Sequence, residues 1–236
     1  MNDTPLWAVV PAAGSGARMG TSIPKQYLPL HGKTVIEHTV ERLLAHPRVA
    51  GVVLALAADD GHWAALQRVF DKPVWLVAGG AERSDSVRNA LMLLGEQASA
   101  SSWVLVHDAA RPCLRAQDID RLIDAAADHA VGALLGVRVN DTVKRSDARG
   151  SVTATVSREG LWRALTPQMF RLGALREALE AAQRAGEPIT DEAGAMERLG
   201  LQPLMVEGHA DNIKITRPQD LALAALFLRQ QQEQEA

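Results

Sequence analysis

The chain has 236 residues, of which 47% are hydrophobic and 22% are charged, and its formal net charge at pH 7 is −3. This size and apolar content suit a single domain over residues 1–236 with a sizeable core, and the negative balance argues against general attraction to nucleic acid. The single cysteine, Cys113, excludes an internal disulfide and gives no evidence of a cysteine metal cluster. No apolar stretch is long enough to span a bilayer and no secretory signal is evident, so we expect a cytoplasmic protein with no membrane partner.

Short apolar runs alternate with amphipathic patterns along most of the chain. The apolar runs predict strands at Trp7–Val10, Val52–Leu56, Val74–Val77, Val104–Val106 and Ala133–Val137. Their continuous hydrophobicity is typical of parallel strands that are covered on both faces. Apolar residues at helical spacing predict helices around Ile36–Leu44, Val87–Leu94 and Ile119–Ala126.

This alternation predicts an α/β fold in which a doubly wound, mostly parallel sheet is covered by helices. Ligands of such sheets sit beyond the carboxyl ends of the strands. The segments that follow Val10, Val77 and Val106 are therefore expected to form the binding site.

The alternation is interrupted at about residues 138–156, RVNDTVKRSDARGSVTATV. This β-arm insertion is predicted to be two short strands joined by a polar turn around Asp147–Gly150. A lone hairpin is only marginally stable in water. The arm should therefore pack either on a second subunit or on its own domain.

Regular patterns return in the C-terminal third. They predict helices at Leu172–Ala185 and Asp191–Leu199, a strand pair at Pro203–Val206 and Ile213–Thr216, and a last helix from near Pro218. The polar tail RQQQEQEA (229–236) is expected to be frayed.

The most informative segment is Val9–Tyr27, VVPAAGSGARMGTSIPKQY, in which an apolar strand leads into a glycine-rich loop and then two cations. Gly14 and Gly16 allow the backbone to approach a ligand closely, and successive N–H groups in such a loop form a concavity that binds anions. Arg18 and Lys25 add full positive charges, so the segment favours a polyphosphate and hence a nucleotide. The Walker pattern GxxxxGK[ST] is absent, and the dinucleotide pattern GxGxxG fails because its third glycine comes one residue late.

Five later runs complete the pattern: GGAERSDSV (79–87), VHDAARP (106–112), LTPQ (165–168), TDEA (190–193) and DNIKIT (211–216). Together with PAAGxGxRM and PKQY, they resemble the sugar-phosphate nucleotidyltransferases, and within them the family of 2-C-methyl-D-erythritol 4-phosphate cytidylyltransferases. The resemblance covers essentially the whole chain. It implies a Rossmann-like nucleotidyltransferase fold with a protruding β-arm, which in that family reaches across a homodimer.

The reaction implied by the resemblance transfers CMP from CTP to 2-C-methyl-D-erythritol 4-phosphate. It gives 4-diphosphocytidyl-2-C-methyl-D-erythritol and pyrophosphate, in non-mevalonate isoprenoid precursor biosynthesis. Another sugar-alcohol phosphate, such as ribitol 5-phosphate, is the nearest alternative acceptor, because the choice between them depends on a few side chains. A non-catalytic CTP-binding protein and a dinucleotide oxidoreductase are the alternatives from other classes.

The acceptor phosphate is already ionised near neutral pH, so the implied chemistry needs positioning and charge stabilisation rather than a protein base. Arg18 and Lys25 are the catalytic candidates, which would stabilise the transition state and the leaving pyrophosphate. Asp108, which follows an apolar strand, is the candidate Mg²⁺ ligand, with a turn or helix cap as its alternative role. His107 is expected to be structural, because it lacks partner ligands at suitable spacing. Asp211 is either a second metal ligand or a turn residue.

The resemblance also assigns the two binding sites. Nucleotide binding is assigned to Pro11, Ala12, Ala13, Gly14, Gly16, Lys25, Gly79, Gly80, Arg83, Ser86 and Asp108. Substrate binding is assigned to Asp108, Arg111, Thr142, Arg158, Thr166, Thr190 and Lys214. In the family, the residues that match Thr142 and Arg158 come from the arm of the neighbouring subunit.

Overall fold

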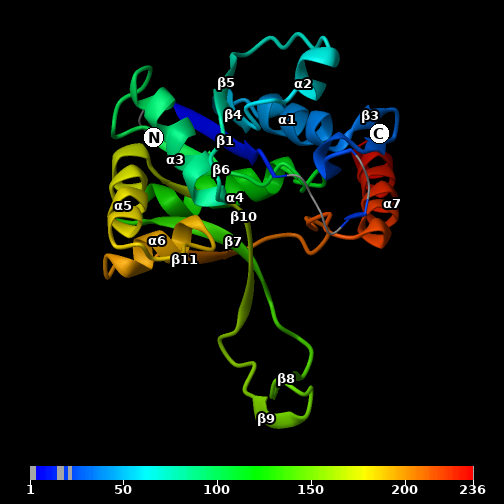
Figure 1. Ribbon diagram of the computed structural model, residues 1–236, viewed down its shortest axis with the longest axis vertical. Coiled ribbons are helices and arrows are strands. Elements are labelled where there is room, and N and C mark those ends of the chain that lie inside the picture. The colour runs from blue at the N-terminus through cyan, green and yellow to red at the C-terminus, as the bar shows by residue number, and fades with distance from the viewer. Residues whose placement is uncertain (1–3, 15–18, 21–22, 236) are drawn as a thin grey trace.

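A seven-stranded sheet with helices on both faces forms the body of the chain in the computed structural model, which describes residues 4–14, 19–20 and 23–235 (Figure 1). The strand order is β11-β7-β10-β6-β1-β4-β5. Strand β10 runs antiparallel to its neighbours β6 and β7, whereas the other neighbouring pairs are parallel. The strands are β1 (Leu6–Ala12), β4 (Val49–Leu56), β5 (Val74–Ala78), β6 (Trp103–Val106), β7 (Gly132–Arg138), β10 (Trp162–Arg171) and β11 (Leu204–Glu207). The predicted mostly parallel α/β fold is confirmed.

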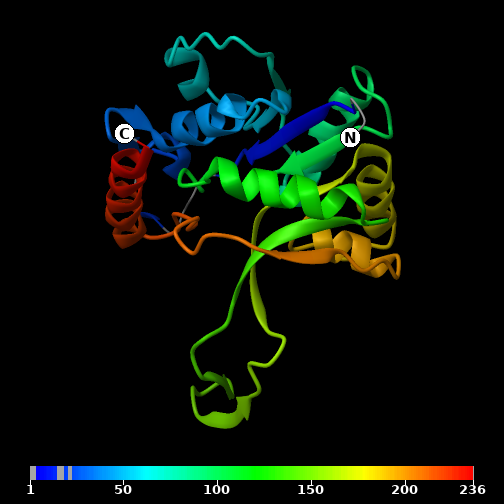
Figure 2. The same ribbon diagram turned by 180° about the vertical axis from the view of Figure 1, so that it is seen from behind.

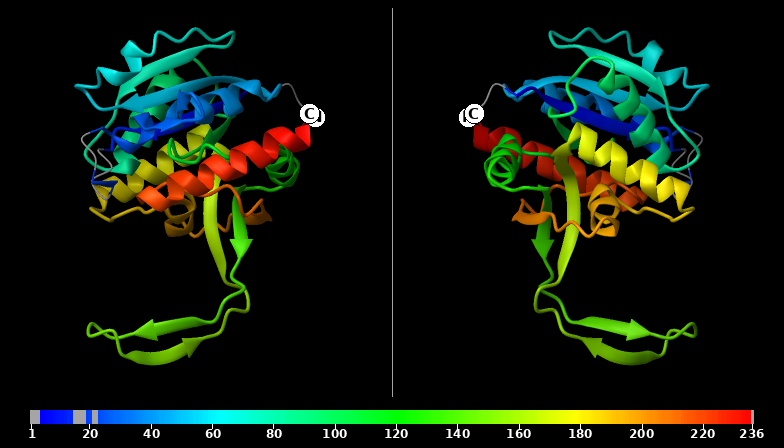
Figure 3. Two further views of the ribbon diagram at one scale, coloured as in Figure 1. Left: turned by 90° about the vertical axis from the view of Figure 1, so that its right-hand side faces the viewer. Right: turned by 90° about the vertical axis from the view of Figure 1, so that its left-hand side faces the viewer.

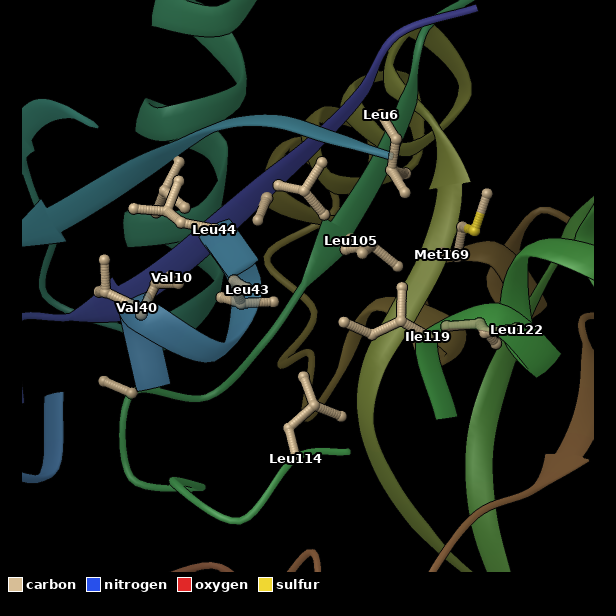
Figure 4. Close-up of a cluster of buried hydrophobic side chains, with 14 of the residues drawn as sticks. Leu6, Val10, Val40, Leu43, Leu44, Leu105, Leu114, Ile119, Leu122 and Met169 are labelled. Carbon is tan, nitrogen blue, oxygen red and sulfur yellow. The ribbon is translucent and has the colours of Figure 1, made fainter. Parts of the chain in front are cut away.

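The helices cover the sheet in two layers, seen from opposite sides in Figures 1 and 2. The helices of the chain are α1 (Val35–Ala45), α2 (His62–Ala65), α3 (Arg83–Gly95), α4 (Ala116–Ala127), α5 (Leu172–Arg184), α6 (Glu192–Arg198) and α7 (Pro218–Glu235), of which α7 lies beyond the edge of the sheet. Alternate residues of β1 enter different layers: Ala8 and Val10 join a cluster with residues of α1 and α4, whereas Val9 joins one with residues of α3 and α5. Figure 4 shows part of the first cluster. Burial on both faces explains why the sequence of these strands is continuously apolar.

The connection from β1 to α1 contains a short 3-10 helix, η2 (Lys25–Tyr27), and a two-stranded ribbon of β2 (Pro29–Leu30) and β3 (Lys33–Thr34). A third apolar cluster lies beneath it and includes Leu28, Ile215 and Leu228. Helix α7 therefore packs against the segment that follows β1 and the segment that follows β6. No helix in the described ranges is long and apolar enough to cross a membrane.

The arm is a two-stranded antiparallel ribbon of β8 (Val143–Ser146) and β9 (Val152–Val156), as predicted. Its turn is closed by the Asp147 carboxylate, which accepts hydrogen bonds from the backbone N–H groups of Arg149 and Ser151, both at 2.9 Å. Gly150 has a φ of +86°, a conformation that favours glycine. The arm projects away from the sheet and its helices (Figures 1 and 3). Within the described part of the chain, the principal contacts of β8 and β9 are with each other rather than with the body.

Two features of the C-terminal half differ from the sequence-based prediction. The segment Ile213–Thr216 forms no strand; β11 instead pairs with β7. Strand β10, which lies in the middle of the sheet, was not predicted, because Pro167 and the polar residues of WRALTPQMFR do not fit a buried strand pattern. The register of β10 against β7 is irregular between Ala164 and Gln168, where the chain accommodates the proline.

The tail is helical rather than frayed over its described residues, because α7 continues to Glu235. Gln231 is 1% exposed, and its side-chain amide donates to the Cys113 carbonyl at 3.0 Å and to the Asp211 carboxylate at 2.9 Å. The buried Nε2 group of Gln231, with its two acceptors, ties the helix end to the body, which a polar composition does not reveal.

We predict that Gln231→Leu lowers the free energy of unfolding by about 1–3 kcal/mol, because the buried Cys113 carbonyl loses its donor. Gln230→Leu, at an exposed position of the same helix, is the control and should change stability little. Urea unfolding of the three proteins measures the difference. Equal stability of the two variants would show that the buried amide does not hold the tail.

Candidate active site

A cavity of about 390 Å³ opens where β1, β5 and β6 end, at the sheet edge that the sequence predicts. Its lining includes nine of the predicted nucleotide-binding residues: Pro11, Ala12, Ala13, Gly14, Lys25, Gly80, Arg83, Ser86 and Asp108. Gly79 lies directly beside it, whereas Gly16 and Arg18 lie outside the described residues. Three loops that are distant in sequence therefore meet around one space, as the parallel topology requires.

The first loop is held by Gln26, a residue of the PKQY run that the sequence analysis did not single out. Its side-chain amide is buried and donates to the carbonyl oxygens of Ala12 at 2.7 Å and Gly14 at 3.2 Å. A Cβ added at Gly14 would have no heavy atom of the described residues within 4 Å. Next to Gln26, the Lys25 ammonium donates to the Ile215 carbonyl at 2.9 Å.

The second loop packs closely on the first because Gly79 has no side chain, and closely on its own helix α3 because Gly80 has none. A Cβ at Gly79 would lie 2.4 Å from that of Ala13, and one at Gly80 would lie 2.2 Å from that of Asp85. The Ser86 hydroxyl accepts a hydrogen bond from the Gly80 N–H at 3.1 Å and so fixes the loop. Helix α3 is capped by Glu82 in a capping box with Asp85.

Asp108 lies at the centre of a cluster of cations. Its Oδ1 accepts from Arg83 Nε at 3.0 Å, and its Oδ2 accepts from Lys214 Nζ at 3.0 Å and from Arg111 Nε at 3.2 Å. Burial on its own raises the pKa of Asp108, but the positive charges of Arg83, Lys214 and Arg111 outweigh it and hold the pKa far below its usual range. Asp108 is therefore ionised at neutral pH.

His107, beside Asp108, is fully buried and connects the loop after β6 to β10 through hydrogen bonds. Its Nε2–H donates to the Arg111 carbonyl at 3.0 Å, so its Nδ1 accepts from the Thr166 hydroxyl at 3.0 Å. The Thr166 oxygen in turn accepts from the Asp108 N–H at 3.1 Å. This arrangement requires a neutral imidazole, and burial lowers the pKa of His107 to about 4. The structural role predicted for His107 agrees with these contacts.

A second cavity of about 190 Å³ lies on the other side of Asp108. Its lining includes the five predicted substrate residues of the body: Asp108, Arg111, Thr166, Thr190 and Lys214. Arg83, Asp108 and Lys214 line both cavities and thus form a wall between them. A donor nucleotide on one side and an acceptor on the other would meet at this wall.

The structure does not bring Thr142 and Arg158 to either cavity of their own chain, as far as the described lining shows. Both are exposed and flank the arm, and the Arg158 guanidinium donates to the Asn140 carbonyl. Asp211 is also absent from the described lining. Its Oδ2 pairs with Arg115 Nε at 2.9 Å and accepts from Gln231, which favours the turn role over that of a metal ligand.

Residues 6–230 match the family described as 2-C-methyl-D-erythritol 4-phosphate cytidylyltransferase. The chain belongs to this family. It is 57% identical over 226 residues to the protein of that name from Aeromonas hydrophila, which covers 96% of this chain and 90% of the relative. It is 52% identical over 235 residues to the protein of that name from Hahella chejuensis, which covers 100% of this chain and 98% of the relative. The resemblance based on motifs is confirmed.

Solved structures agree with this membership. A crystal structure of a 4-diphosphocytidyl-2C-methyl-D-erythritol synthase matches with a TM-score of 0.83 at 38% identity, covering 95% of this chain and 99% of that chain. The 2-C-methyl-D-erythritol 4-phosphate cytidylyltransferase from Francisella tularensis matches with a TM-score of 0.82 at 34% identity, covering 95% and 100%. The match extends over the whole architecture and not over the first loop alone.

The neutral state of His107 predicts a pH dependence of stability. The pKa of a histidine is about 6.5 in an unfolded chain and about 4 for His107 in the fold. Between these values the unfolded chain binds more protons, so the free energy of unfolding decreases as the pH falls. We expect His107 to account for a loss of about 2 kcal/mol between pH 7 and pH 5.

Urea unfolding of the wild type and of His107→Asn at the two pH values tests this expectation. The variant should lose about 2 kcal/mol less than the wild type over the same interval. His62→Asn, at an exposed position, is the control and should follow the wild type. The same pH dependence in all three proteins would mean that His107 is not held neutral.

Proposed function

We propose that this chain transfers CMP from CTP to 2-C-methyl-D-erythritol 4-phosphate, releasing pyrophosphate and giving 4-diphosphocytidyl-2-C-methyl-D-erythritol. The family and the named relatives support this reaction, and they do not favour ribitol 5-phosphate as the acceptor. The observation that carries the proposal in the structure is the charged wall of Arg83, Asp108 and Lys214 between two cavities. The reaction belongs to non-mevalonate isoprenoid precursor biosynthesis, and we place it in the cytoplasm because CTP is available there.

In the chemical step, a phosphate oxygen of the acceptor forms a bond to the α-phosphorus of CTP. The bond from that phosphorus to the bridging oxygen breaks, and its electron pair leaves with pyrophosphate. Because the attacking oxygen is already ionised, the protein acts by holding the groups in line and stabilising charge. We assign this stabilisation to Lys25, which lines the nucleotide cavity, and to Arg18.

For the acceptor, the second cavity offers Arg111, Thr166, Thr190 and Lys214. Lys214 suits a phosphate monoester as a point charge, whereas arginine offers a planar fork. Lys214 lines both cavities and can therefore draw the acceptor phosphate toward the α-phosphorus. Gly80, Ser86 and the backbone beside Gly79 are assigned to the base and ribose.

We further propose that Mg²⁺ binds together with the triphosphate. Among the described residues, Asp108 Oδ1 accepts one hydrogen bond, from Arg83. An ionised carboxylate oxygen has about two lone-pair sites, so one remains for a cation. Three cations surround Asp108 and repel free Mg²⁺, whereas the charge of the triphosphate would offset them. The described residues also form no cluster of three metal-binding side chains. When bound, Mg²⁺ would neutralise charge on the leaving pyrophosphate.

We propose finally that the chain works as a homodimer through its β-arm. The arm projects from the body (Figure 3), and Thr142 and Arg158 beside it reach neither cavity of their own chain in the described lining. A partner's arm would supply these two residues to the acceptor cavity, as the family pattern implies. A two-fold dimer would give each body one arm.

The assigned reaction is tested by pyrophosphate release from CTP and Mg²⁺ with purified protein. We expect release with 2-C-methyl-D-erythritol 4-phosphate and little release with ribitol 5-phosphate. Lys25→Ala should reduce turnover by at least about tenfold, because a charge that stabilises the transition state is lost. Its circular dichroism spectrum provides the control for folding. Preferential release with ribitol 5-phosphate would overturn the substrate, and near-normal turnover of Lys25→Ala would overturn the role of that lysine.

The dimer predicts complementation between two inactive variants. Lys25→Ala affects the body and Arg158→Ala affects the arm, so a mixed dimer pairs one intact body with one intact arm. Co-expression should therefore restore about a quarter of the wild-type activity if the chains associate at random. Each variant expressed alone is the control. If the arm served its own body, every chain would keep a defect and co-expression would restore nothing.

A further inference from the structure

Glu192 is a buried carboxylate that contacts the wall through Arg83 and lines neither cavity in the described lining. It lies in the first turn of α6 and is 1% exposed. Its Oε1 accepts from Arg83 NH1 at 2.7 Å and its Oε2 accepts from Arg83 NH2 at 3.1 Å. This two-point geometry fixes the plane of a guanidinium as well as its distance.

The third nitrogen of the same guanidinium, Arg83 Nε, donates to Asp108 Oδ1 at 3.0 Å. Arg83 is thus held between two carboxylates, one in the wall and one behind it. Burial alone would lower the pKa of Arg83, but the charges of Glu192 and Asp108 raise it above its usual range. The guanidinium stays charged, and its orientation is determined from both sides.

Glu192 is itself fixed to the sheet through Gln168 of β10. The Gln168 side chain is buried; its Oε1 accepts from the Ala193 N–H at 2.8 Å, and its Nε2 donates to the Asp191 carboxylate at 2.9 Å. Asp191 also caps α6 by accepting from the Gly194 N–H at 3.0 Å. The start of α6 therefore has a fixed position, and the two hydrogen bonds from Arg83 to Glu192 hold the guanidinium relative to it.

We propose that Glu192 is a positioning residue for the transfer reaction, which acts by holding Arg83 in the wall shared by the two cavities. This inference rests on the proposed function. Without the charge of Glu192, Asp108 would be the one remaining carboxylate partner of Arg83 among the described residues. The guanidinium would then be attracted toward Asp108 alone. The wall would then shift on its nucleotide side and its acceptor side together, because Arg83 lines both cavities.

Glu192→Gln, which keeps the shape of the side chain and removes its charge, tests the proposal. We expect kcat/KM to fall at least about tenfold, with the KM values for CTP and for the acceptor both raised. A purely structural role would reduce the fraction of folded enzyme, which lowers apparent kcat and leaves both KM values unchanged. Glu197→Gln, at an exposed position of the same helix, is the matched control and should resemble the wild type.

A double-mutant cycle with Arg83→Gln shows whether Glu192 acts through Arg83. The double variant should be no more than about twofold less active than Arg83→Gln alone, and more stable than it, because Arg83→Gln leaves Glu192 buried without a counter-charge. Losses in kcat/KM that multiply, or a Glu192→Gln enzyme within twofold of the wild type, would overturn the proposal.

The same proteins separate this inference from the proposed function. If the wild type releases pyrophosphate and Glu192→Gln matches it, only the role of Glu192 fails. If the wild type releases none with either acceptor, the proposed function fails. In that case the double-mutant cycle is measured on CTP affinity instead of kcat/KM, by calorimetric titration with CTP and Mg²⁺. Weaker CTP binding by Glu192→Gln is the expected result, and unchanged binding would overturn the role of Glu192.

Discussion

The pairing of Asp108 with three cations is the interaction on which the site depends. A pocket for a triphosphate and a phosphate monoester needs an excess of positive charge, and these charges repel one another when no substrate is bound. The Asp108 carboxylate lies within 3.2 Å of Arg83, Lys214 and Arg111 nitrogens and offsets part of that repulsion. The cations can therefore be held in place before the substrates arrive, which avoids reorganisation during the reaction.

The topology of the sheet brings these charges together. Asp108 follows β6, Arg83 begins the helix after β5, and parallel strands open their loops at one edge. The antiparallel strand β10 adds Thr166 from the opposite chain direction, where its hydroxyl links the Asp108 backbone to His107. A strand of reversed direction thus contributes Thr166 to the 190 Å³ cavity, next to the loops that line the 390 Å³ cavity.

The sequence predicted those parts of the fold that depend on repeated patterns. Buried strands such as Val49–Leu56 are continuously apolar, and their helices have one apolar face, so their positions could be predicted within a few residues. Strand β10 could not, because its irregular register and Pro167 break any pattern. Gln26 and Glu192 were missed for a different reason: a buried polar side chain is recognised only by its partners, which lie far away in the sequence. Both nevertheless lie within the motifs PKQY and TDEA, so the motifs marked the segments but not the buried roles of these two residues.

The segment Ile213–Thr216 shows why an irregular backbone can be the most constrained part of a site. Its Ile215 N–H donates to the Ala110 carbonyl at 2.9 Å, the Ile215 carbonyl accepts from Lys25, and the Ile215 side chain is buried in the cluster beneath α7. In a paired strand these backbone groups would belong to a ladder. Here they connect the loop after β6 to the PKQY run, while Lys214 reaches Asp108. Ile215 therefore helps to position two lysines from opposite ends of the chain: Lys25, which bonds to its carbonyl, and its neighbour Lys214. The Ile215 carbonyl is available to Lys25 because the segment is not paired in a sheet.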